Sequence, residues 1–193
     1  VISSSEISVV APKKLGVEVL NDISLDEITP YIDWTPFFQT WELHGRFPNI
    51  LEDKIVGEEA QSLFRDAKEM LTKITANHWL MAKAVYGIFP ANTVGDDIEI
   101  YSDENRSEVL NIQRTLRQQT KKASGQANLA LADFIAPKET GNIDYIGGFA
   151  VTAGLGIEQH IEKFEKDHDD YNSILLKALA DRLAEALAEY LHE

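Results

Sequence analysis

Apolar residues recur every three to four positions in three parts of the chain, and this spacing predicts amphipathic helices. The clearest helix is predicted over 51–76, where the apolar side chains fall on one face of a helix with a 3.6-residue period. Two more helices are predicted over 157–167 and 171–193, so the C-terminal third is expected to be helical. The last of them has a leucine at every fourth position: Leu175, Leu179, Leu183 and Leu187.

The N-terminal part has a different pattern. Residues 1–25 have no helical period and are interrupted by Ser, Pro and Gly, which predicts an extended N-terminal segment. Ser24 predicts the start of a short helix, because its hydroxyl can cap the helix while Glu27 completes a capping box. Over 31–43, aromatic residues are spaced by three and four, which places them on one helical face. Pro36 fits the first turn of that helix.

The middle of the chain changes to short apolar runs and to an alternation with a period of two, and both patterns are typical of strands. Strands are predicted over 84–89, 97–100, 129–135 and 145–153, the first of them ended by Pro90. The segment 111–118 is compatible with a strand or with a helix. The order of helices, then strands, then helices favours an α+β fold over a doubly wound fold.

Composition and charge narrow the function classes. With 193 residues, 44% of them hydrophobic, the chain has the size and composition of one globular domain. It contains no cysteine, which excludes disulfides, thiolate zinc sites and a cysteine nucleophile, and which leads us to expect a reducing, cytoplasmic location. The net charge of −14 argues against nucleic-acid binding. The sequence contains neither an apolar run of about 18 residues, as a membrane helix would need, nor a signal peptide.

Both ends of the sequence lack the signals of a natural terminus. The chain begins with Val1 rather than Met, and it stops at Glu193 inside a helical pattern that has no Gly or Pro stop signal. We therefore expect the chain to be a fragment of a longer protein.

Asp33 is the first candidate binding residue. It lies between Ile32 and Trp34 in the aromatic stretch, just before Pro36. A carboxylate that is desolvated among rings needs a partner, because burying an unpaired charge is costly. The same carboxylate is also well placed to accept backbone N–H groups as a helix cap. A helix cap and a residue that binds a cationic ligand are therefore both open interpretations of Asp33.

An acidic row is the second candidate site. Asp181, Glu185 and Glu189 are spaced by four, so they share one face of the last predicted helix. Like charges at this spacing destabilise a helix slightly, and Lys177 is expected to relieve the row at one end only. The row is either a solvated helix face or an acidic edge that binds a cation, an amine or a metal ion.

Two further clusters have a structural and a functional interpretation. The segment 95–99 contains three acidic residues but lacks the oxygen ligands of a calcium loop, so a turn that leads into a strand is favoured. The acidic residues next to His168 are favoured as the start of a helix. The competing hypothesis is a metal-dependent hydrolase built on Asp96, Asp97, His168 and Asp169.

Several longer segments follow one another in a specific order. They are YIDWTPFF at 31–38, GRFP at 45–48, FPAN at 89–92, VGDDIEIY at 94–101, LRQQ at 116–119, LADFIAP at 131–137, HDDYN at 168–172 and KALADRLAEA at 177–186. In this order, over residues 12–193, the sequence resembles the activation domain of cobalamin-dependent methionine synthase. Several long matches in order are far more specific than any one short motif.

The resemblance implies a fold and a function. The fold would be a C-shaped α+β domain with an antiparallel sheet and flanking helices, of which 26–193 would be the N-terminal two-thirds, lacking the C-terminal part. The enzyme transfers a methyl group from methyltetrahydrofolate to homocysteine through cobalamin. Its activation domain binds S-adenosylmethionine and supports the reductive remethylation of cob(II)alamin. The implied partners are the cobalamin-binding module of the same enzyme, which mainly binds the cobalamin, and a flavodoxin-type reductant.

The resemblance also implies site residues. The family's motifs place S-adenosylmethionine-binding carboxylates at Asp33 and Glu185, and no catalytic or metal-binding residue in this chain. The family's Arg-x-x-x-Gly-Tyr segment, which contributes further ligand contacts, is not in this sequence, so the chain is not expected to be a complete enzyme. Without that segment, the leucine row is expected to be uncovered and to promote self-association. The alternative function is a stand-alone acidic module that binds a basic protein.

Overall fold

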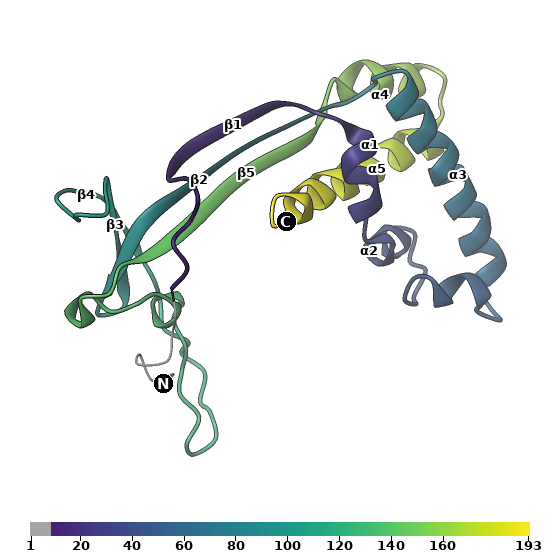
Figure 1. Cartoon of the computed structure of the whole chain (residues 1–193). Helices are drawn as coiled ribbons and strands as arrows, with labels where there is room; N and C mark the ends of the chain where they lie inside the picture. Colours follow the sequence, from purple (N-terminus) through teal and green to yellow (C-terminus); the bar gives the residue numbers. More distant parts are fainter. Residues whose placement is uncertain (1–8) are drawn as a thin grey trace. The chain divides into compact units, whose positions relative to one another are not determined.

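The chain folds into two compact units, and a computed structural model describes residues 9–193 of it. Unit 1 contains 86–149 and the described residues up to Glu18. Unit 2 contains 19–85 and 150–193. Three long strands have residues in both units: β1 (Gly16–Ile23), β2 (Met81–Val94) and β5 (Asp144–Leu155) (Figure 1).

The strands form one five-stranded sheet. Its order is β1-β2-β3-β4, and β5 pairs with β2. β2 runs antiparallel to β3 (Asp97–Tyr101), which runs antiparallel to β4 (Val109–Arg114). The β2–β3 hairpin closes where Val94 pairs with Asp97, through a two-residue turn that begins at Gly95. Gly95 has a φ of +65°, which tight hairpin turns require and which glycine adopts without strain. The predicted turn is therefore confirmed.

The strand predictions are confirmed for β3 and β5 and wrong in two details elsewhere. Pro90 does not end β2, because its missing N–H lies outside the ladder with β3, which begins at Ala91. The segment 129–135 forms a 3-10 helix, η3 (Leu131–Phe134), instead of a strand. The cause is local: the Asp133 carboxylate accepts the backbone N–H three residues before it and closes a turn. The ambiguous segment resolves into β4 followed by a loop.

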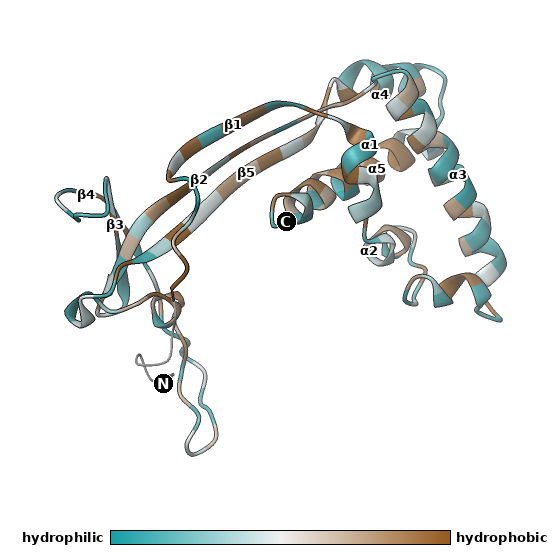
Figure 2. Ribbon diagram, in the orientation of Figure 1, coloured by the Kyte–Doolittle hydropathy of each residue, from teal (hydrophilic) through white to brown (hydrophobic). Residues whose placement is uncertain are grey.

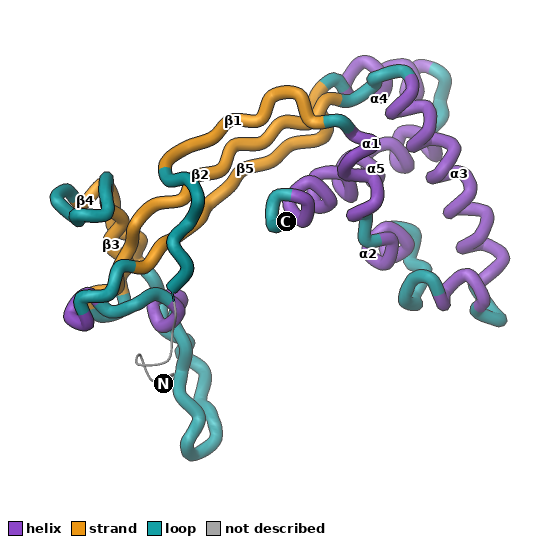
Figure 3. Tube along the Cα trace, in the orientation of Figure 1, coloured by secondary structure: helices purple, strands orange, loops and turns teal. Residues whose placement is uncertain are grey.

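The long connection between β4 and β5 is mostly loop (Figure 3), and Arg117 anchors it. The guanidinium donates to Asp133 at 2.6 and 2.8 Å, to Asp96 at 2.5 Å, and to the carbonyl of Asn128 at 2.8 Å. Hydrogen bonding to Arg117 lowers the pKa of Asp133 to about 2. The base of this loop is thus held by charge, while its tip is exposed.

The 3-10 helices η3 and η4 (Lys138–Thr140) lie in unit 1, and all the other helices of residues 9–193 lie in unit 2. The short ones are α1 (Leu25–Ile28), η1 (Thr29–Tyr31), α2 (Trp34–Gln39) and η2 (Asn49–Glu52), and the long ones are α3 (Gly57–Ala76), α4 (Ile157–Lys166) and α5 (Asp170–Tyr190). Hydrophilic and hydrophobic residues alternate around α3, as expected of an amphipathic helix (Figure 2). Within residues 9–193, no helix combines the length and the apolar character needed to cross a membrane. The predicted α+β class, an antiparallel sheet with flanking helices, is confirmed.

Two helix starts differ from the prediction. The helix expected from residue 51 begins only at Gly57, because the Asp53 carboxylate accepts the N–H groups of Ile55 and Val56 and holds the backbone in a turn before α3. Ile55, expected in the core, is 91% exposed. The Ser24 hydroxyl makes no capping hydrogen bond, so the predicted capping box is wrong. The carboxylate of Glu27 instead accepts a hydrogen bond from the Tyr190 hydroxyl.

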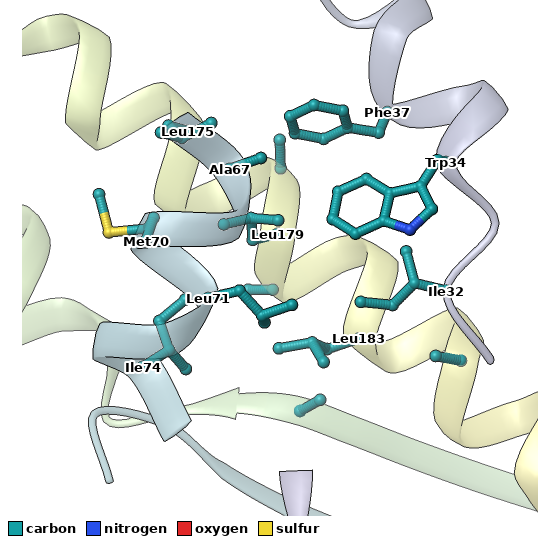
Figure 4. Close-up of a cluster of buried hydrophobic side chains, with 14 of the residues drawn as sticks. Ile32, Trp34, Phe37, Ala67, Met70, Leu71, Ile74, Leu175, Leu179 and Leu183 are labelled. Carbon is teal, nitrogen blue, oxygen red and sulfur yellow. The ribbon is translucent and has the colours of Figure 1, made fainter. Parts of the chain in front are cut away.

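The core of unit 2 packs α2, α3 and α5 together (Figure 4). The leucines of α5 are at most 1% exposed: Leu175, Leu179, Leu183 and Leu187. Each contributes about 1.5–3 kcal/mol by leaving water. Leu175, Leu179 and Leu183 lie among Trp34 and Phe37 of α2 and the apolar side of α3. The prediction that this row is uncovered is therefore wrong, because the row is already part of the core, and self-association stays a prediction that this row does not support.

Candidate functional site

Asp33 is the N-terminal cap of α2. Its Oδ1 accepts the backbone N–H of Thr35 at 2.9 Å, and its backbone is extended. The side chain is exposed, whereas the neighbouring Trp34 is only 8% exposed and points into the core. The expectation that Asp33 is desolvated among rings is therefore wrong. The capping interpretation is confirmed, and the ligand interpretation stays a prediction, because a carboxylate can accept further hydrogen bonds.

The aromatic cluster beneath Asp33 fixes the start of α2. The ring of Trp34 packs edge-on against Phe37, with centroids 5.3 Å apart, and against Phe64 of α3, at 4.9 Å. Such pairs contribute about 0.5–1.5 kcal/mol beyond their burial. The Thr35 hydroxyl accepts the N–H of Phe47 at 3.2 Å and so ties the following loop to the same turn. The carboxylate of Asp33 thus projects from a rigid base.

The second acidic group lies on α5 around Arg182. Its guanidinium donates to Glu185 through Nη1 at 2.6 Å and Nη2 at 2.8 Å, and to Asp181 at 2.6 Å. The Arg182 side chain is only 9% exposed, whereas the Glu185 and Asp181 side chains are 61% and 70% exposed. Burial opposes the charge of Arg182, but the hydrogen bonds to both acids outweigh it and raise the pKa of the guanidinium. The cluster is therefore a buried cation with two carboxylates at the surface.

This geometry corrects the expectation for the acidic row. Lys177 does not relieve it, because its Nζ lies 3.9 Å from Glu165 of α4. Arg182 instead reduces the repulsion within the row, because it forms ion pairs with Asp181 and Glu185. The sequence already held the signal, since Arg182 stands next to Asp181 and three residues before Glu185, within reach on a helix.

Packing of α5 against η1 and α2 joins the elements that carry Asp33 and Glu185. The rings of Tyr31 and Tyr190 meet edge-on, with centroids 5.6 Å apart. The Tyr31 hydroxyl donates to Glu193 at 2.6 Å, and the Tyr190 hydroxyl donates to Glu27 at 3.2 Å. The two candidate carboxylates therefore belong to one packed group of helices, and both are exposed. Exposed carboxylates on a rigid base suit a cationic ligand.

The other candidate residues have structural roles. Asp96 and Asp97 are paired with Arg117 and Arg114 at the hairpin turn. Asp169 caps α5 by accepting the Asn172 N–H at 3.0 Å. Across residues 9–193, no group of three or more His, Asp or Glu side chains could hold a metal ion. The metal site that the hydrolase hypothesis requires does not form in that range.

A hollow of about 290 Å³ opens at the start of α1 and does not include either candidate carboxylate. Polar side chains, among them Asp22, Asp26 and His78, line it together with apolar ones such as Leu25 and Leu80. Its volume lies at the lower end of the range of ordinary ligand pockets, which begins at about 300 Å³. The candidate site is therefore an exposed acidic surface of α2 and α5 rather than this hollow.

Comparison with known proteins relates the chain to one family and to a solved structure. The family described as "Vitamin B12 dependent methionine synthase, activation domain" matches residues 24–193. A crystal structure of the MetH reactivation domain bound to AdoHcy superposes with a TM-score of 0.92 and 55% sequence identity. The match covers 98% of this chain and 57% of that chain, so this chain spans less than two-thirds of the solved domain's length.

Proposed function

Because the chain belongs to the family of vitamin B12-dependent methionine synthase activation domains, we propose that it binds S-adenosylmethionine to support reactivation of the enzyme's cobalamin. The observation that carries this proposal is the similarity to an AdoHcy-bound reactivation domain, at 55% identity over 98% of this chain. AdoHcy is S-adenosylmethionine without its transferable methyl group. A site that binds AdoHcy therefore has contacts for every part of S-adenosylmethionine except the methyl group.

Asp33 and Glu185 are the proposed ligand residues. S-adenosylmethionine carries an ammonium and a sulfonium, for which carboxylates are the natural partners. AdoHcy has no sulfonium charge, so the ammonium is the cation that both ligands share. Asp33 can cap α2 through Oδ1 and still accept a hydrogen bond from the ligand, because an ionised carboxylate has about four acceptor positions. When bound, S-adenosylmethionine supplies the methyl group, while these residues bind and orient it.

The enzyme's reaction and partners follow as part of the proposal. The parent activity is methyl transfer from methyltetrahydrofolate to homocysteine through cobalamin, which another module mainly holds. The activation domain works with that module and with a flavodoxin-type reductant. The lack of cysteine supports a cytoplasmic location. The alternative of a stand-alone acidic module for a basic protein is not favoured, because the family match covers most of the chain.

Calorimetric titration tests the proposal. S-adenosylmethionine and AdoHcy are titrated separately into the complete natural polypeptide that contains this chain. We expect saturable binding of both ligands to a single site. Absence of heat for both ligands at millimolar concentration would refute the proposed function.

A further inference from the structure

We propose that Arg182 is a positioning residue of the ligand site, and that it orients the Glu185 carboxylate to receive the ammonium group of S-adenosylmethionine. The inference rests on the proposed function, because it requires Glu185 to be a ligand residue. It goes further by giving a role to a cation in a site whose ligand is itself cationic.

The hydrogen-bond geometry is the first step. Both oxygens of Glu185 accept from Arg182, from Nη1 at 2.6 Å and from Nη2 at 2.8 Å. A two-bond pairing of this kind fixes the plane and direction of a carboxylate, which a single bond does not. Glu185 is otherwise an exposed side chain on a helix surface, with freedom to change rotamer. Arg182 therefore removes that freedom before any ligand arrives.

Burial is the second step. The Arg182 side chain is 9% exposed, so its charge cannot be returned to water when a ligand binds. Leaving a buried charge unpaired is strongly unfavourable. Glu185 and Asp181 must therefore stay on Arg182 in the ligand-bound state. The incoming ammonium does not displace Arg182 but uses the acceptor positions of Glu185 that the guanidinium leaves open.

Charge is the third step, and it works against the first. Arg182 cancels one of the two negative charges, so its removal would increase the attraction for a cationic ligand. Both acids are more than half exposed, and charge interactions exposed to water contribute only about 0–1 kcal/mol. Ordering one free side chain on binding lowers affinity by about three- to tenfold. Orientation is therefore the larger effect, and loss of Arg182 weakens binding.

The test is a double-mutant cycle of binding affinity. Kd is measured for S-adenosylmethionine and AdoHcy, at physiological salt, on the complete natural polypeptide that contains this chain. The variants are Arg182→Gln, Glu185→Gln and the double variant. We expect Arg182→Gln to weaken both ligands equally, by about three- to tenfold. We expect no further weakening when it is added to Glu185→Gln, because Arg182 acts through Glu185.

Two other variants separate orientation from charge and from folding. Arg182→Lys keeps the positive charge but cannot make the two parallel hydrogen bonds of a guanidinium, and it should weaken binding as much as Arg182→Gln. It also serves as the test if Arg182→Gln does not fold. Lys177→Gln removes a cation five residues earlier on α5, which contacts Glu165 instead, and it should leave Kd unchanged.

The outcomes that overturn the inference differ from those that overturn the proposed function. If the wild-type protein binds ligand but the losses of Arg182→Gln and Glu185→Gln multiply in the double variant, Arg182 does not act through Glu185. Unchanged Kd in a folded Arg182→Lys or Arg182→Gln variant also overturns the inference. If the wild-type protein binds neither ligand, both the inference and the proposed function are wrong.

Discussion

Replacing Asp33 by Asn separates the two roles that this residue can have. Asn caps helices about as well as Asp, so the hydrogen bond to the Thr35 N–H is kept and the unfolding free energy should change by less than about 0.5 kcal/mol. The negative charge is lost, and with it a charge-assisted hydrogen bond to the ligand's ammonium, worth about 1.5–3 kcal/mol. Calorimetry should therefore show S-adenosylmethionine binding weakened by about ten- to a hundredfold.

Two more variants control this experiment. Asp33→Ala removes both the cap and the charge, so it should lose about 1 kcal/mol of stability in addition to affinity. Asp53→Asn removes the same charge from another exposed Asp, whose carboxylate accepts the backbone N–H groups of Ile55 and Val56. It should leave the affinity unchanged. If Asp33→Asn binds as tightly as the wild type while Asp33→Ala melts at a lower temperature, Asp33 is only a helix cap.

Three further predictions follow from the structure. Leu183→Ala should lower the free energy of unfolding, measured by chemical denaturation, by about 2–5 kcal/mol. Ile174→Ala on the same helix should lower it far less, because Ile174 is 48% exposed. Equal losses would show that the leucine row is not part of the core. Burial, and to a smaller extent Lys163, lowers the pKa of His160, so the unfolded chain binds a proton more readily than the folded one. The contribution of His160 to the free energy of unfolding should therefore be complete above about pH 6.5 and decrease in more acidic solution. His160→Gln should reduce this dependence on pH. Brief trypsin digestion should cut first after Lys121 or Lys122, in the exposed loop tip, and an early cut within α3 would contradict the loop assignment.

The long helices could be predicted from the sequence because each has one continuous apolar face. α5 combines its leucines with a capping Asp169, and these local signals agree with its tertiary packing. Two of the failures occurred where one polar side chain redirected the backbone. Asp53 holds a turn just before α3, and Asp133 turns an apolar segment into η3. The hydropathy pattern does not predict such hydrogen bonds, because an Asp that accepts backbone N–H groups has the same hydropathy as an Asp that faces water.

The geometry of the candidate site also depends partly on contacts within one helix and partly on packing between helices. Asp33 is fixed by Thr35, two residues on, and Glu185 is fixed by Arg182, three residues back, so each orientation is set by its own helix. These short-range pairs are within the reach of sequence analysis. The placement of the two carboxylates on one group of helices depends instead on how α5 packs against η1 and α2, through leucines and rings that contact no ligand. A core substitution such as Leu183→Ala can therefore weaken ligand binding by shifting α5, while each local pair stays intact.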